Sequence, residues 1–202
     1  AINYFGRRIS YADMFSCIDR VSQAFSTLNI KQGEFVSLCL LTMPEAVYSI
    51  YGLNKIGAIS NLIEPRTNAA QIRDRINATN SRVLMVVDIF LPKILQIVAE
   101  TKLEHIIIVP ISESMPALKK IGFSFTKGRK IKLVPRNEKY LSWKEFIETG
   151  NISGLVCARY VKNSPAVVVY TGGTTGVPKG AILSNDSLTA MALQSIYSSS
   201  RW

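Results

Sequence analysis

The sequence has only one histidine and three cysteines among its 202 residues. The histidine, His105, opens the apolar run at residues 106–108, so we interpret it as structural. A histidine-based catalytic triad and a metal site with several histidines are therefore excluded. The cysteines, Cys17, Cys39 and Cys157, are odd in number, far apart and without the spacing of metal ligands. We expect them to be reduced and buried, as in a cytoplasmic protein.

Long hydrophobic runs are also missing. The longest, near residues 35–43, is far shorter than the roughly 20 residues that a membrane-spanning helix needs. We expect no secretory leader. Because 48% of the residues are apolar, a buried core is still expected, and the length suits about one domain. We expect a soluble protein.

Acidic residues are few, 14 against 24 lysines and arginines, which gives a net charge of +10. Most of the excess lies between Lys119 and Lys139, where eight cations face one acid, Glu138. We interpret this segment as a solvated, lysine-rich excursion within about residues 112–140. A peripheral contact with an anionic membrane or a polyanionic partner is the alternative. No aromatic-rich platform accompanies it, so nucleic acid is not an expected partner.

Helical and strand patterns alternate along most of the chain. Helices are predicted from Ser10 to near Gly33, from Pro44, and at about residues 68–79, 91–100 and 143–148. Apolar runs predict strands at residues 35–41, 58–63, 82–87, 106–109 and 166–170. A further helix, capped by Asn185 and Asp186, is expected near the end. This order predicts an α/β fold with a doubly wound, mainly parallel sheet flanked by helices.

Residues 170–180 are the most informative segment, because they combine four glycines, three threonines, a proline and a lysine. The glycines, Gly172, Gly173, Gly176 and Gly180, can take φ values that other residues avoid, so several N–H groups can point at one anion. Thr171, Thr174 and Thr175 add hydroxyl donors, and Lys179 adds a positive charge. The composition predicts a phosphate-binding loop.

Two other phosphate motifs do not match this loop. In the Walker pattern a serine or threonine follows the lysine, whereas Gly180 follows Lys179 here. The dinucleotide fingerprint opens a helix, whereas residues 180–183 have the composition of a short strand. A plain glycine turn would not need three threonines and a proline-lysine pair.

The segment at 170–180 resembles the phosphate-binding signature of the adenylate-forming enzymes, a superfamily that includes acyl-CoA synthetases and other AMP-dependent ligases. Residues 9–14 are similar to the family's opening helix motif, and residues 53–58 are similar to its leucine-x-lysine-x-glycine-alanine segment. The resemblance covers nearly the whole chain, with only general similarity at residues 112–150.

This resemblance implies that a carboxylic acid and ATP form an acyl-adenylate, and that coenzyme A then takes the acyl group. It implies ATP contacts for Thr171, Gly172, Gly173, Thr174, Thr175, Gly176 and Lys179, with Thr171 nearest to Mg²⁺. Family members run to several hundred residues, so we expect residues 1–202 to be an incomplete N-terminal ATP-binding domain. The C-terminal domain with the catalytic lysine is missing, so no catalytic residue is assigned and the fragment should be inactive.

One position departs from the family pattern. Asn185 follows Ser184 where many members have histidine, which puts a local acyl contact in doubt. The segment at 59–65 is more similar to acyl-CoA synthetases than to amino-acid adenylation domains, which favours a fatty acid substrate. An aryl-acid or amino-acid adenylation domain and a non-catalytic nucleotide-binding module are the alternatives.

Several other residues invite a functional reading but have a simpler one. We interpret Arg66 and Arg73 as parts of a solvated helix face, although either could meet an anion. Tyr140 and Trp143 are expected to be packing anchors.

Overall fold

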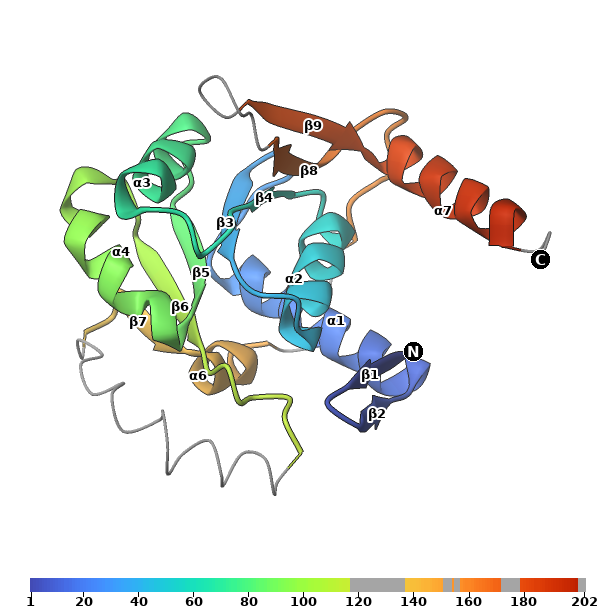
Figure 1. Ribbon diagram of the computed structural model, residues 1–202, viewed down its shortest axis with the longest axis horizontal. Coiled ribbons are helices and arrows are strands. Elements are labelled where there is room, and N and C mark those ends of the chain that lie inside the picture. The colour runs from blue at the N-terminus through green and yellow to red at the C-terminus, as the bar shows by residue number, and fades with distance from the viewer. Residues whose placement is uncertain (117–136, 151–153, 155–156, 172–178, 200–202) are drawn as a thin grey trace.

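The computed structural model describes residues 1–116, 137–150, 154, 157–171 and 179–199. Its centre is a seven-stranded sheet with the strand order β7-β6-β5-β3-β4-β8-β9, and a two-stranded hairpin, β1 and β2, precedes it (Figure 1). The strands are β1 (Ile2–Tyr4), β2 (Arg7–Ile9), β3 (Phe35–Cys39), β4 (Ile59–Leu62), β5 (Val83–Val87), β6 (His105–Val109), β7 (Tyr140–Ser142), β8 (Pro165–Tyr170) and β9 (Gly180–Ser184). The α-helices are α1 (Tyr11–Thr27), α2 (Pro44–Lys55), α3 (Ala69–Ala78), α4 (Leu91–Ile97), α6 (Trp143–Glu148) and α7 (Asn185–Ser199).

The sheet is parallel from β7 to β8, which confirms the predicted doubly wound arrangement. Strand β9 is antiparallel to β8 and pairs Tyr170 with Gly180. Only nine residues separate the two strands, too few for the crossover that a parallel neighbour requires. The chain therefore returns directly, and Tyr170 and Gly180 are paired on either side of the glycine-rich segment.

Helices cover both faces of the sheet and enclose two apolar cores. On one face, side chains of α1, α2 and α6 pack on the strands, among them Phe25, Leu53 and Phe146. On the other face, α3 and α4 contribute Ile72 and Ile94. Figure 1 shows α3 and α4 on the opposite side of the sheet from α1 and α2. Both faces are covered, and β5 is accordingly a continuous apolar run. Strands β3 and β4 also carry buried polar residues, Ser37, Ser60 and Asn61.

Local sequence signals explain where several helices begin. Ser10, Asn68 and Ser142 each accept a backbone N–H of the first turn with their side chains, and Pro44 occupies the first turn of α2. Helix α1 ends at Thr27, earlier than the predicted end near Gly33, since Asn29 adopts a φ of 56°. A left-handed residue of this kind stops a helix.

The expectation that all three cysteines are buried needs correction. Cys39 is buried, but Cys17 is only half-buried and Cys157 is exposed, and all three are free thiols. Cys157 lies on the connection that leads to β8 and belongs to neither of the two apolar cores, so its thiol is not packed among their buried side chains. The hairpin of β1 and β2 and the strand β7 were not predicted, because segments of three residues carry almost no periodicity.

Candidate functional site

Thr171 and Lys179 face each other at the base of the glycine-rich segment. The backbone N–H of Thr171 donates to the carbonyl oxygen of Lys179 at 3.0 Å, directly beyond the last pair of the β8–β9 ladder. The Thr171 hydroxyl also lies 3.4 Å from that carbonyl oxygen. Both residues are exposed, and no described carboxylate is within ion-pair distance of the Lys179 ammonium group. Thr171 is thus bonded to the backbone of Lys179, while the Lys179 ammonium group has no carboxylate partner among the described residues.

The other predicted loop residues lie outside the described part of the chain: Gly172, Gly173, Thr174, Thr175 and Gly176. The same is true of the basic segment from Lys119 to Arg136. Gly180 is described and has a role that differs from the predicted one. It lies in β9 without a positive φ, and a Cβ atom there would meet Val168 Cγ1 at 3.0 Å and the Tyr170 ring at 3.2 Å. Close packing, rather than backbone freedom, thus favours a glycine at this position.

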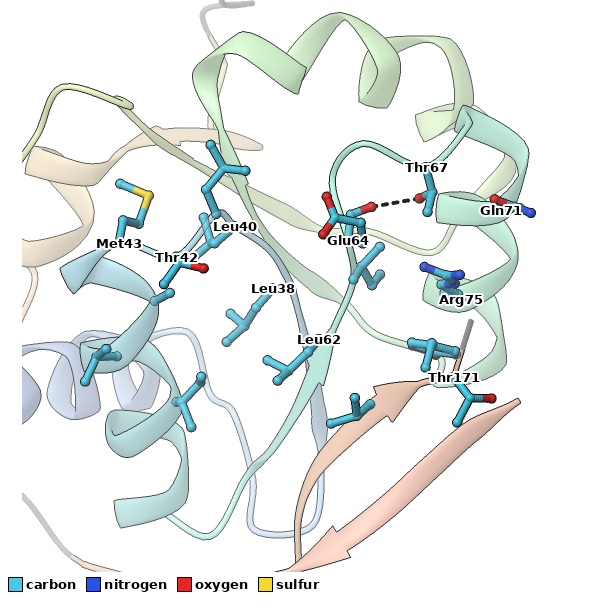
Figure 2. Close-up of a pocket in the computed structure, with 17 residues that line it drawn as sticks. Leu38, Leu40, Thr42, Met43, Leu62, Glu64, Thr67, Gln71, Arg75 and Thr171 are labelled. Carbon is cyan, nitrogen blue, oxygen red and sulfur yellow. Dashed lines mark hydrogen bonds between the residues drawn. The ribbon is translucent and has the colours of Figure 1, made fainter. Parts of the chain in front are cut away.

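A pocket of about 670 Å³ lies beside the base of the loop, at the carboxyl ends of β3 and β4 (Figure 2). Leu38, Met43 and Leu62 belong to its apolar lining, while α3 contributes the polar side chains of Gln71 and Arg75. Thr171 lies on the same wall as Arg75. Ligands of doubly wound sheets bind at the carboxyl ends of the strands. An apolar pocket with one polar wall suits a ligand that is both apolar and charged.

Lys93 holds the loop between β4 and α3, which forms the rim of this pocket. Its ammonium group donates to the carbonyl oxygens of Pro65, Arg66 and Thr67 at 3.2, 3.4 and 2.8 Å. Within the same loop, the Thr67 hydroxyl donates to the carbonyl oxygen of Glu64 at 2.7 Å, as Figure 2 shows. The rim is therefore shaped by internal hydrogen bonds, and the sequence signals that we considered did not indicate this role for Lys93.

The side chain of Asn185 is engaged in a structural contact. Its amide oxygen accepts from Asn54 of α2, and its amide nitrogen donates to the Ser164 hydroxyl at 3.1 Å. The predicted cap of α7 differs as well, since the hydroxyl of Ser184 accepts the N–H of Ser187 at 3.2 Å. Asn185 is the first residue of the helix rather than its cap.

The remaining candidates have structural partners. Arg66 pairs with Glu64 at 2.8 Å, and Arg73 pairs with Asp74 and Glu100 at 2.9 and 2.7 Å, as expected for a solvated face. The predicted packing of Trp143 is confirmed, since it is buried in one of the two cores. Tyr140 is half-buried against the other core. His105 begins β6 among buried strand residues.

Two broader classes of site find no support in the described ranges. No group of three or more histidine, cysteine, aspartate or glutamate side chains there could hold a metal ion. None of the helices in those ranges is long and apolar enough to cross a bilayer.

A sequence model of the family described as "AMP-binding enzyme" matches residues 1–202, the whole chain. The chain belongs to the family of AMP-binding enzymes. This confirms the resemblance that the loop at 170–180 and the two upstream segments indicated.

Curated members of the AMP-binding family with similar sequences carry several substrate names. A long-chain-fatty-acid–CoA ligase of Bacillus subtilis is 23% identical over 94% of this chain and 34% of its own length. Acetyl-coenzyme A synthetase 1 of Kluyveromyces lactis is 26% identical over 95% of this chain and 26% of its own length. The 4-coumarate–CoA ligase of Vanilla planifolia is 25% identical over 93% and 30%. The chain thus spans roughly a third or less of the length of these relatives.

Solved structures agree with the assignment to the AMP-binding family. The anthranilate CoA ligase AuaEII, crystallised in complex with anthranoyl-AMP, superimposes with a TM-score of 0.71 at 26% identity. The match covers 88% of this chain and 30% of that one. A long-chain-fatty-acid–CoA ligase from Archaeoglobus fulgidus has the same fold, with a TM-score of 0.70 at 21% identity over 92% of this chain and 32% of its own.

Proposed function

We propose that the full-length protein is an acyl-CoA synthetase that activates a carboxylic acid with ATP and transfers the acyl group to coenzyme A. The observation that carries this proposal is the backbone hydrogen bond between Thr171 and Lys179 at the base of the glycine-rich segment, beside the pocket. Membership in the AMP-binding family and the relatives named as CoA ligases support it. Residues 1–202 would supply the phosphate-binding part of the site.

The first step forms a bond between a carboxylate oxygen and the α-phosphorus of ATP and breaks the bond to pyrophosphate. Negative charge then grows on the leaving pyrophosphate, so fixed positive groups around it lower the barrier. The exposed Lys179 ammonium group would neutralise part of that charge, and the Thr171 hydroxyl and the loop N–H groups would donate to phosphate oxygens. In the second step the thiol sulfur bonds to the acyl carbon, AMP leaves, and the thiol proton is released.

The described residues near the loop fit a polyphosphate better than a bare metal ion. A hydroxyl oxygen of Thr171 and a lysine are present, but a cluster of carboxylates is not, within the described ranges. Mg²⁺ would therefore be held mainly by phosphate oxygens, with Thr171 as the protein ligand. When bound, Mg²⁺ withdraws charge from the phosphates and so favours departure of pyrophosphate.

For the carboxylic acid, we propose a fatty acid. The apolar lining of the pocket and the relatives named for long-chain fatty acids favour this class. The relatives named for 4-coumarate and anthranilate favour an aryl acid as the second candidate. Both classes carry one carboxylate on an apolar body, so the two predictions differ only in the shape of that body.

Carboxylate-dependent exchange of pyrophosphate into ATP, measured on the full-length protein, tests the proposal. Wild type should catalyse exchange with at least one fatty or aryl acid from a broad panel. Lys179→Ala removes a charged hydrogen bond and should lower kcat/KM for ATP by roughly 10- to 100-fold. Lys162→Ala, which removes another exposed lysine, is the matched control and should leave it unchanged. Absence of exchange with every acid would refute the proposal, and an unaffected Lys179→Ala variant would refute the loop assignment.

A further inference from the structure

Tyr170 is the last residue of β8, so its position sets where the glycine-rich segment begins. Its hydroxyl donates to the Oδ1 atom of Asn61 at 2.9 Å. Asn61 lies in β4, beside Val168 of β8 in the register, and is fully buried. The tyrosine side chain therefore reaches back over its own strand to a buried partner on the next strand.

The amide nitrogen of Asn61 is held just as firmly. It lies 2.9 Å from the hydroxyl of Ser37 on β3, and 3.1 Å both from the Thr79 hydroxyl and from the carbonyl oxygen of Arg75. Two N–H groups thus serve three acceptors. Because each polar atom of this buried amide has a partner, the Oδ1 atom can point in only one direction. That direction is toward Tyr170.

Arg75 fixes the same tyrosine from the other side. Its guanidinium carbon lies 4.5 Å from the centroid of the Tyr170 ring, a stacked cation–π contact. Arg66, Arg73 and Arg82 each pair with a carboxylate, whereas no described carboxylate pairs with Arg75. Figure 2 shows Arg75 and Thr171 on the same wall of the pocket. The Tyr170 side chain is therefore held by the Arg75 guanidinium over its ring and by the hydrogen bond from its hydroxyl to Asn61.

We propose that Asn61 and Arg75 are positioning residues for Thr171, the first residue of the phosphate-binding loop, and act through the neighbouring Tyr170. The proposal rests on the proposed function, in which that loop binds ATP. Donors that are held in place before the ligand arrives need no reorganisation, and small misplacements weaken catalysis strongly. The contacts join β3, β4, β8 and α3, so the exit of the chain into the loop is tied to the centre of the sheet.

Tyr170→Phe in the full-length protein is the principal test, since it removes one hydroxyl and keeps the ring under Arg75. We expect the Kd for ATP, measured by calorimetry, and the KM for ATP in pyrophosphate exchange to rise roughly three- to tenfold. The KM for the carboxylate should stay within about twofold of wild type, because a hydrogen bond of this kind acts only through the loop. Tyr140→Phe removes another half-buried tyrosine hydroxyl, at the far edge of the sheet. It should leave the Kd and KM for ATP and the KM for the carboxylate unchanged.

Variants of Arg75 and Asn61 separate positioning from general stability. Arg75→Met should weaken ATP binding as Tyr170→Phe does, and Arg75→Lys, which keeps a cation near the ring, should restore most of the affinity. Tyr170→Phe and Asn61→Ala break the same contact, so they form a double-mutant cycle. The variant that carries both changes should bind ATP no more weakly than Asn61→Ala alone. If Asn61→Ala does not fold, Tyr170→Phe decides.

The outcomes keep the two proposals apart. If Tyr170→Phe binds ATP as tightly as wild type does, the positioning inference is overturned, and normal pyrophosphate exchange by the wild type would still support the proposed function. If wild type binds ATP but exchanges no pyrophosphate, the proposed function fails, while weaker ATP binding by Tyr170→Phe still supports positioning. A wild type that binds no ATP overturns both.

Discussion

The inner strands of the sheet and its β9 edge have similar apolar residues in different surroundings. In β5 and β6, helices cover both faces, and Ile107 has no exposed surface. In β9 and α7, apolar side chains remain open, with Ile182 58% and Ile196 63% exposed. We call these the covered region (β3, β5 and β6 with their helices) and the open region (β9 and α7). The contrast teaches that an apolar side chain stabilises the fold only where neighbours remove it from water.

The largest expected difference concerns isoleucine truncation. In the 202-residue chain, Ile107→Ala should lower the free energy of unfolding by about 2–5 kcal/mol, because it leaves a cavity in a packed core. Ile182→Ala, the matched change in the open region, should cost less than about 1 kcal/mol. Urea denaturation with constant m-values measures both. Equal losses would show that β9 is covered in solution.

A buried carboxyl group in the covered region predicts an intermediate, pH-dependent effect. Glu45 lies in the first turn of α2 and is 1% exposed. One of its oxygens accepts from the Ser114 hydroxyl, and the other has no hydrogen-bond partner among the described residues. Burial raises the pKa of Glu45 above its usual value, and it outweighs the hydrogen bond from Ser114. The folded state thus binds a proton more tightly than the unfolded state does.

The sign of the pH effect follows from that difference. The stabilisation from Glu45 is complete below the carboxyl's ordinary pKa and is lost as pH rises through the raised pKa of the folded state. Glu45→Gln, which stays neutral, should therefore become more stable than wild type as pH rises toward neutrality. Glu148→Gln, at an exposed glutamate of α6, is the control and should show no such gain. Melting curves at several pH values test this, and parallel curves for wild type and Glu45→Gln would contradict it.

The smallest expected difference concerns two serine caps. Ser142 caps α6 of the covered region with a reciprocal bond to Glu145, and Ser184 caps α7 of the open region. Ser142→Ala should lower the free energy of unfolding by about 1 kcal/mol. Ser184→Ala should mainly increase fraying of α7, with a smaller global loss, since an exposed helix can open locally. Denaturation reports the first effect and amide hydrogen exchange in α7 the second; a reversed order would break the comparison.

Much of the fold could be predicted because its signals are local. The helix start at Pro44 and the helices at about residues 68–79 and 143–148 follow from neighbouring residues, and the structure confirms them. The short strands β1, β2 and β7 could not be predicted, because their pairing partners, rather than their own periodicity, make them strands. The exposure of Cys157 likewise depends on what lies around it.

The candidate site divides in the same way. The run of threonines, glycines and Lys179 at 170–180 is a local pattern, so the sequence by itself determined the family, and the phosphate-binding role of this segment stays a prediction. Only the tertiary structure decided what surrounds the loop. Asn61 and Tyr170 are 109 positions apart, and Arg75 belongs to neither strand, so no spacing in the sequence brings them together. The parallel pairing of β4 with β8 does so, although β5, β6 and β7 lie between these two strands in the sequence. Contacts of this kind depend on which strands lie side by side in the folded sheet.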